Sequence, residues 1–217
     1  MPAAAPHKIR LPGEDRRRQL LKAAIETFAQ KGFGGTKTKD IAAAAGVSEA
    51  ILFRHFASKE DLYHAILDTK GPDGGKNQHI RELEALAARR DDAGLFGNLA
   101  VAIVKSFRED PAFHRLILYA SLEGHLLASL FRARFGLPMG NFLRRYIALR
   151  QKEGAFHRCD PDVAIAFFCG AIVQYAMARY LFGVNEHHQD EPAVVKELVA
   201  LVMRGLEKKK GHHEQHS

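Results

Sequence analysis

Residues 36–63 read TKTKDIAAAAGVSEAILFRHFASKEDLY, and this stretch decides the fold of the N-terminal third of the chain. Thr38, Ser48 and Ser58 each stand before a run of helix-forming residues, where a hydroxyl can cap the first turn of a helix. Gly46 stands between the first two runs, where a left-handed residue ends a helix. The stretch therefore predicts two short helices joined by a tight turn, and then the start of a third helix.

A longer helix is expected before this stretch, from about residue 16 to 31. Leu21, Ile25 and Phe28 lie at positions i, i+4 and i+7, which places them on one apolar face. Gly32 is expected to end this helix. We therefore assign residues 16–70 to one compact, all-helical domain that presents the helix at about 49–55 outward. A helix is the element that fits the major groove of DNA, so DNA binding is the leading hypothesis.

The spacing of many residues in this domain supports a more specific assignment. The residues concerned are Phe28, Gly32, Phe33, Thr36, Thr38, Ile41, Ala42, Ala45, Gly46, Val47, Ser48, Leu52, Phe53, Arg54, His55, Phe56, Ser58, Lys59, Glu60 and Leu62. In this order they resemble the N-terminal domain of the tetracycline-repressor (TetR) family. The resemblance implies an all-α fold, with a helix-turn-helix DNA-binding domain and a C-terminal bundle for ligand binding and dimerisation. It also favours repression over activation.

The resemblance implies which side chains touch the sugar–phosphate backbone of DNA, namely Thr38, Ser48, His55 and Lys59. At Phe53 the family usually has a tyrosine whose hydroxyl binds a phosphate, so one contact is missing here or is replaced by Arg54.

For base reading we favour the first turn of the recognition helix, residues Glu49, Ala50 and Ile51. Glu49 can accept from a cytosine amino group, and Ala50 or Ile51 can meet a thymine methyl group. An alternative for Glu49 is stabilisation of the helix N-terminus by its charge. For Thr38 and Ser48 the alternative is capping alone.

The charge of the chain is concentrated in the same region. Residues 1–60 contain 11 Lys and Arg against 6 Asp and Glu, and the net charge of the whole chain is +7. Such asymmetry is typical of a polyanionic partner. Residues 1–15 are expected to be a flexible basic arm, with Lys8 and Arg10, that either reaches the minor groove or remains solvated. The segment Met1–Gly13 lacks an apolar core, so no signal peptide and a cytoplasmic location are expected.

No cofactor, metal ion or catalytic site is predicted. Cys159 and Cys169 give no disulfide framework, and the chain contains no CxxC, HExxH or Walker-type loop. Paired carboxylates or a nucleophile–base set, which an enzyme of this fold would need, are not evident. The histidines at 187, 188, 212, 213 and 216 could bind a transition metal, but solvated side chains are the simpler interpretation.

The rest of the chain reads as a second helical domain, residues 77–207, after a breaker at 71–75 and before a disordered Lys-rich tail at 208–217. Six helices are expected, at 77–90, 94–109, 111–135, 138–153, 161–183 and 191–207. The run from Val163 to Phe182 is apolar over a length that could span a membrane. Gln174 and Arg179 interrupt it, and we expect instead a helix buried on two sides. Together with the last helix it predicts a four-helix homodimer interface.

A dimer would read a palindromic operator with two recognition helices about one helical turn (~34 Å) or a multiple of it apart. The middle helices supply candidate residues for a small hydrophobic effector that would release the operator: Phe107, His114, Tyr119, Glu123, His125, Phe131 and Tyr146. The alternative for these aromatic residues is an ordinary core. Two rival functions remain open, a DNA-bound scaffold that recruits a protein without an effector, and a helical-bundle enzyme.

Overall fold

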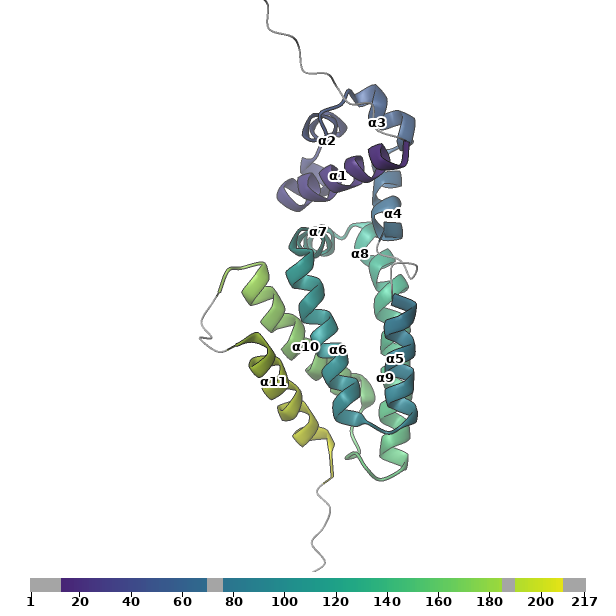
Figure 1. Ribbon diagram of the computed structural model, residues 1–217, viewed down its shortest axis with the longest axis vertical. Coiled ribbons are helices and arrows are strands. Elements are labelled where there is room, and N and C mark those ends of the chain that lie inside the picture. Colours follow the sequence, from purple (N-terminus) through teal and green to yellow (C-terminus); the bar gives the residue numbers. More distant parts are fainter. Residues whose placement is uncertain (1–12, 70–75, 185–189, 209–217) are drawn as a thin grey trace, which may run out of the picture. The chain divides into compact units, whose positions relative to one another are not determined.

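The computed structural model describes residues 13–69, 76–184 and 190–208. Within these residues the regular structure is helical, apart from one isolated antiparallel bridge between Phe156 and Glu207. The chain divides into two compact units. The first comprises Met1–Gly71 with Arg115–Ala128, and the second comprises Pro72–His114 with Ser129–Ser217. The all-α fold class predicted from the sequence is confirmed (Figure 1).

In its described residues, the first unit contains four complete helices and parts of two more. They are α1 (Gly13–Gly35), α2 (Thr38–Ala44), α3 (Glu49–His55), α4 (Lys59–Thr69), the end of α7 (Pro111–Leu122) and the start of α8 (Leu126–Phe131). Helix α1 begins three residues earlier than expected and has Glu14 and Asp15 in its first turn. Carboxylates stabilise a helix N-terminus, which accounts for the earlier start. The expected basic arm lies largely outside the described residues.

Gly32 interrupts α1 close to the predicted end. Its φ of 68° and ψ of −179° are not helical, and the remaining residues up to Gly35 form a last turn beyond this kink. Such a backbone conformation is accessible almost only to glycine. The sequence therefore identified the correct residue, but as a helix end rather than as a kink.

The core of the first unit follows the apolar pattern of the sequence. Leu21 and Phe28 of α1 and Leu52 of α3 are buried, and so is Phe56, which directly follows α3. The side chain of Gln19 donates a hydrogen bond from Nε2 to the carbonyl oxygen of Ala45, 3.0 Å away. This bond joins α1 to the end of α2, so the helix-turn-helix segment is held by polar contact as well as by packing.

Three of the four residues predicted to begin or end a helix lie at the helix ends where the sequence placed them. Gly46 has a φ of +64° and follows α2, Ser48 is the N-cap residue of α3, and the Ser58 hydroxyl accepts from the backbone N–H of Asp61 (3.1 Å). Thr38 is not a cap, which corrects our expectation. The helix starts one residue earlier with Lys37 as N-cap, because the Asp40 carboxylate accepts the Lys37 backbone N–H at 3.3 Å.

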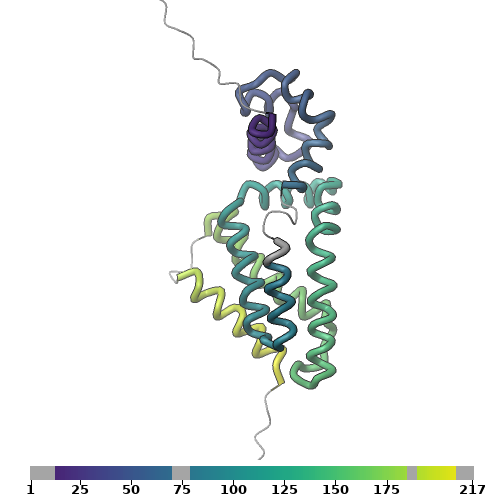
Figure 2. Tube along the Cα trace, turned by 45° about the vertical axis from the view of Figure 1, so that its right-hand side comes forward, coloured from purple at the N-terminus to yellow at the C-terminus, as the bar shows by residue number. Residues whose placement is uncertain are grey.

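The second unit is a helical bundle around α6. Helix α6 packs against α5, α10 and α11, and α10 also packs against α9, as the two views show (Figures 1 and 2). Its core includes Phe96 and Phe168, whose rings meet edge to face at 5.1 Å. The helices are α5 (Lys76–Ala88), α6 (Asp92–Glu109), the π-helix η1 (Arg132–Gly136), α9 (Leu137–Lys152), α10 (Pro161–Tyr180) and α11 (Glu191–Leu206).

The prediction of one helix over residues 111–135 is wrong, because the helix ends before Gly124. This residue has a φ of +63°, and the N–H groups of Gly124 and His125 bond back to the carbonyl oxygens of Ser121 and Ala120. That pair of bonds is the Schellman arrangement, which ends a helix at a left-handed residue. Because of this break, residues 115–128 cluster with the DNA-binding helices rather than with the C-terminal bundle, to which the sequence assigned them.

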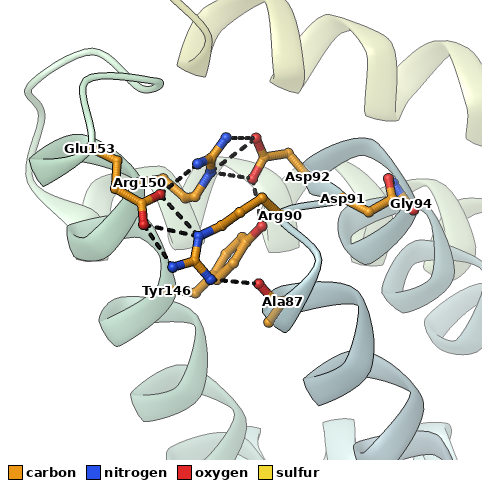
Figure 3. A network of polar contacts seen from close by, with 8 residues as sticks. All are labelled: Ala87, Arg90, Asp91, Asp92, Gly94, Tyr146, Arg150 and Glu153. Carbon is orange, nitrogen blue, oxygen red and sulfur yellow. Dashed lines mark hydrogen bonds and ion pairs between the residues drawn. The ribbon is translucent and has the colours of Figure 1, made fainter.

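One end of the bundle is held by a network of polar contacts (Figure 3). Arg150 of α9 forms a two-pronged ion pair with Asp92 at the start of α6, with Nε–Oδ1 and Nη2–Oδ2 distances of 2.8 and 2.7 Å. The Tyr146 hydroxyl donates to the same carboxylate at 2.6 Å, and Glu153 bridges Arg150 and Arg90. The Arg150 and Asp92 side chains are only 14% and 11% exposed. The network therefore fixes the α5–α6 corner against α9.

Among the described residues, one helix, α10, is long and apolar enough to cross a membrane, judged by length and composition alone. Core helices of soluble proteins pass the same test. One side of α10 is buried in the bundle through Phe168, Ile172 and Tyr175, whereas Val163 and Phe167 are 63% and 62% exposed. The residues 71–75, the histidines beyond residue 184 and nearly all of the tail lie outside the described residues.

Candidate nucleic-acid interface

The structure presents one face of α3 outward. Leu52 and Phe56 anchor the segment in the core, whereas Glu49, Phe53 and Arg54 are exposed. Ser48 and Ala50 are also exposed, and Ile51 and His55 are half-buried. Phe53 is 48% exposed although it is aromatic. An exposed helix face that follows a tight turn is the geometry with which helix-turn-helix proteins enter the major groove.

Two predicted site residues are bound to each other. The Thr38 hydroxyl, on the first residue of α2, donates a hydrogen bond to Oε1 of Glu49, on the first residue of α3. The Ser48 hydroxyl makes no capping bond to α3, although Ser48 occupies the N-cap position. The sequence suggested separate roles for Thr38 and Glu49, because they are eleven residues apart and only the turn at Gly46 brings them together.

Lys59 is held inside the first unit. Its ammonium group donates to the carbonyl oxygens of Phe33 and Thr36, the latter at 2.8 Å, and lies 3.7 Å from the centre of the Phe33 ring. Burial lowers the pKa of this lysine. The predicted contact of Lys59 with a phosphate stays a prediction; two of the three N–H donors of the ammonium group are already bound to these carbonyl oxygens.

Phe33, the ring that Lys59 contacts, belongs to an aromatic cluster. The rings of Phe28, Phe33, Tyr63 and His125 form one packed cluster, in which the ring centres of Phe33 and His125 are 4.0 Å apart and those of Phe28 and Tyr63 are 4.5 Å apart. The Phe33 backbone N–H donates to Oε2 of Glu123 at 3.2 Å. The Tyr63 hydroxyl is buried without a hydrogen-bond partner, and burial, with the nearby Glu123 charge, raises the pKa of Tyr63.

Two of the predicted effector residues belong to the DNA-binding unit and not to the C-terminal bundle, where the sequence placed them. Glu123 and His125, expected in a ligand site, lie against α1 and α4 of the DNA-binding unit. Tyr119 belongs to this unit as well and is partly exposed. The sequence signal that could have revealed this placement is Gly124, which ends α7 and turns the chain toward α1.

The other four predicted effector residues lie in the second unit. The rings of Phe107 and His114 are stacked at 3.7 Å, and the Phe131 ring lies 5.8 Å from Phe113. Tyr146 is buried, and its hydroxyl donates to Asp92 in the network described above. Burial, together with that hydrogen bond, raises the pKa of Tyr146. The predicted set is thus divided between the units, and the role of each residue stays a prediction.

Two basic residues were missed by the sequence reasoning. Lys37 and Lys39 flank Thr38 at the start of α2 and are exposed, and Arg54 is exposed on α3. The clue in the sequence was the alternation Thr-Lys-Thr-Lys before Asp40, which we interpreted only through its threonines. Lysine side chains at the start of a helix beside the reading helix are suited to phosphate contacts, which position a protein on DNA.

Comparison with known proteins agrees with this geometry. The family model described as "Bacterial regulatory proteins, tetR family" matches residues 20–66. The HTH-type transcriptional regulator YvkB of Bacillus subtilis, which is described as uncharacterized, is 40% identical over 204 residues, covering 87% of this chain and 96% of that protein. The chain belongs to the TetR family.

Two further similarities show how this TetR-family protein relates to others. It is 48% identical over 58 residues to the HTH-type transcriptional activator FasR of Mycolicibacterium smegmatis, a match that covers 27% of this chain and spans only 26% of FasR. A TetR family transcription regulator from Marinobacter aquaeolei VT8 has the same fold, with a TM-score of 0.65, 18% identity, and coverage of 90% of this chain and 97% of that one. This TetR-family protein is a DNA-binding transcriptional regulator with a helix-turn-helix reader.

Proposed function

We propose that this regulator binds a palindromic operator as a homodimer, represses transcription in the cytoplasm, and releases the operator when a small hydrophobic effector binds. The observation that carries the proposal is the outward face of α3, with Glu49, Ala50, Phe53 and Arg54 exposed over a buried Leu52. Ser48, Ile51 and His55 flank this face. Exposed Lys37 and Lys39 supply phosphate contacts beside it.

The dimer is supported by the outer face of α10. Val163 and Phe167 are strongly exposed, and the next positions on that face, Gly170 and Gln174, carry no bulky apolar side chain. A glycine beside large exposed apolar residues lets two helices approach closely. Helix α11 contributes less than expected, since Val194, Val195, Val199 and Val202 are buried within the chain and the exposed large apolar residue there is Leu201. We therefore place α10 at the centre of the interface.

The effector site is proposed in the second unit, around the stack of Phe107 and His114 and the edge contact of Phe113 with Phe131. Aromatic rings with one histidine suit an apolar compound that carries one polar group. Helix α7 starts in this unit and ends in the DNA-binding unit, where Glu123 and His125 contact α1 and α4. A shift of α7 would therefore reach the helices that support the reader. The effector must bind the two states with different affinities for this shift to occur.

The test is selection of bound duplexes from a random pool, repeated with candidate effectors. We expect a palindrome with half-site centres about one or two helical turns apart. We also expect an acyl chain or an aromatic acid to release it. A selected sequence without two-fold symmetry, or a monomer by light scattering at micromolar concentration, would contradict the dimer. A reporter gene behind the selected operator then distinguishes repression from activation. FasR is named a transcriptional activator, so both outcomes have to be tested.

A DNA-bound scaffold without an effector is the second candidate. It shares the DNA-reading face, and it predicts an operator complex that no small apolar compound releases. We infer a regulator rather than an enzyme because the relatives that match are named transcriptional regulators.

A further inference from the structure

The hydrogen bond between Thr38 and Glu49 restricts what each side chain can do on DNA. A threonine hydroxyl has one proton and two acceptor lone pairs. In this structure that proton is donated to Oε1 of Glu49. A phosphate oxygen accepts hydrogen bonds and cannot donate one, so the Thr38 hydroxyl cannot donate to a phosphate while it donates to Glu49.

The carboxylate also acts on its surroundings. Glu49 is exposed on the first turn of α3, and its negative charge lies beside the Thr38 hydroxyl. A phosphate brought to that hydroxyl would approach the carboxylate and be repelled by it. The charge thus opposes a phosphate contact at Thr38, whereas exposed Lys37 and Lys39 on either side remain suited to phosphates.

The same bond prepares Glu49 for base reading. A free glutamate side chain has many rotamers, and fixing them on DNA opposes binding. Here the bond to Thr38 restricts the side chain before DNA arrives and leaves its second carboxylate oxygen, Oε2, without that bond. An ionised carboxylate only accepts hydrogen bonds. In the major groove, cytosine offers a donor, its N4 amino group, and guanine offers only the acceptors N7 and O6, while adenine has its N6 donor beside the acceptor N7, which a carboxylate cannot pair with.

We propose that Thr38 is a positioning residue, which holds the Glu49 carboxylate as the acceptor for a cytosine amino group instead of binding a phosphate itself. The inference deepens the proposed function and rests on it, since it requires α3 to enter the major groove. It makes Glu49 a specificity-determining residue, and it makes the hydroxyl of Thr38, rather than its methyl group, the part that matters.

The experiment measures binding of the full-length protein to the selected operator and to duplexes in which each C·G pair is replaced in turn. Glu49→Ala should reduce discrimination at one C·G pair of each half-site about tenfold, which corresponds to one good base contact. Thr38→Val, which has the shape of threonine but no hydroxyl, should reduce discrimination at the same pair. Thr38→Ser keeps the hydroxyl and should behave as the wild type. The double variant Thr38→Val/Glu49→Ala should be no worse than Glu49→Ala, because both substitutions remove one interaction.

Two results would overturn the proposal. Equal weakening of all duplexes by Thr38→Val would show that Thr38 binds a phosphate, and full discrimination in Glu49→Ala would show that bases are read elsewhere. If Thr38→Val does not fold, Glu49→Gln tests base reading by residue 49. A glutamine should shift the preference at that pair from cytosine to adenine, and an unchanged preference would contradict the proposal. Selection of no duplex by the wild type would instead refute the proposed function, so the two failures are distinguishable.

Discussion

Gly32→Ala should destabilise the DNA-binding unit through two separate effects. The φ of 68° and ψ of −179° at Gly32 lie in a region that residues with a Cβ avoid, at a cost of about 1–3 kcal/mol. A Cβ atom added there would also lie 2.3 Å from Oε1 of Glu123, closer than non-bonded atoms can approach. The carboxylate would have to move and would lose its bond to the Phe33 N–H. An exposed hydrogen bond of this kind contributes about 1 kcal/mol, so the total loss is about 2–4 kcal/mol.

Gly34→Ala is the matched control, two residues further along. No atom lies within 4 Å of a Cβ added at Gly34, and its φ is not in the left-handed region. An alanine there should be neutral or stabilise the helical turn by about 0.5–1 kcal/mol. Gly32→Ala in a Glu123→Ala background should lose only the backbone part, so the two substitutions should show a coupling of about 1 kcal/mol.

The assay is amide hydrogen exchange of peptides from α1 and α4, because it reports the stability of this unit separately from that of the bundle. Protein concentration is kept constant, since dimerisation contributes to apparent stability. If Gly32→Ala and Gly34→Ala change protection equally, or if Gly32→Ala loses less than about 1 kcal/mol, the argument from backbone conformation is refuted.

Three other substitutions test different parts of the molecule. Phe53→Tyr should tighten binding to all duplexes about tenfold, because the tyrosine hydroxyl adds a donor to a phosphate at each half-site. Titration with specific and random DNA would measure the gain. A contact with the DNA backbone requires the same gain for both. Asp92→Ala removes the ion pair of Arg150 and should lower the free energy of unfolding in urea by about 2–4 kcal/mol, whereas a change within error would mean that the network is not stabilising. Phe167→Glu should give monomers in light scattering. The control is the single variant Val101→Glu, at an exposed apolar site of α6, which should stay a dimer. If both variants are dimers, the outer face of α10 is not part of the interface.

The sequence by itself determined the local structure of the reader. Gly46 and Ser58 lie where their conformational preferences predicted, and the apolar spacing correctly placed Leu21 and Phe28 in the core. These signals act between residues less than about one or two helical turns apart, so they can be recognised from the amino-acid sequence alone. The family assignment rested on the same spacings.

Only the tertiary structure decided which side chains meet. The Glu123 carboxylate binds the N–H of Phe33 across 90 positions, and the Thr38 hydroxyl binds Glu49 across a turn. Lys59, expected to be free for DNA, is drawn to two carbonyl oxygens by packing of α4 on the kink of α1. A side chain with several possible partners takes the one that the packing of distant segments brings within reach, and no local pattern in the sequence encodes that choice.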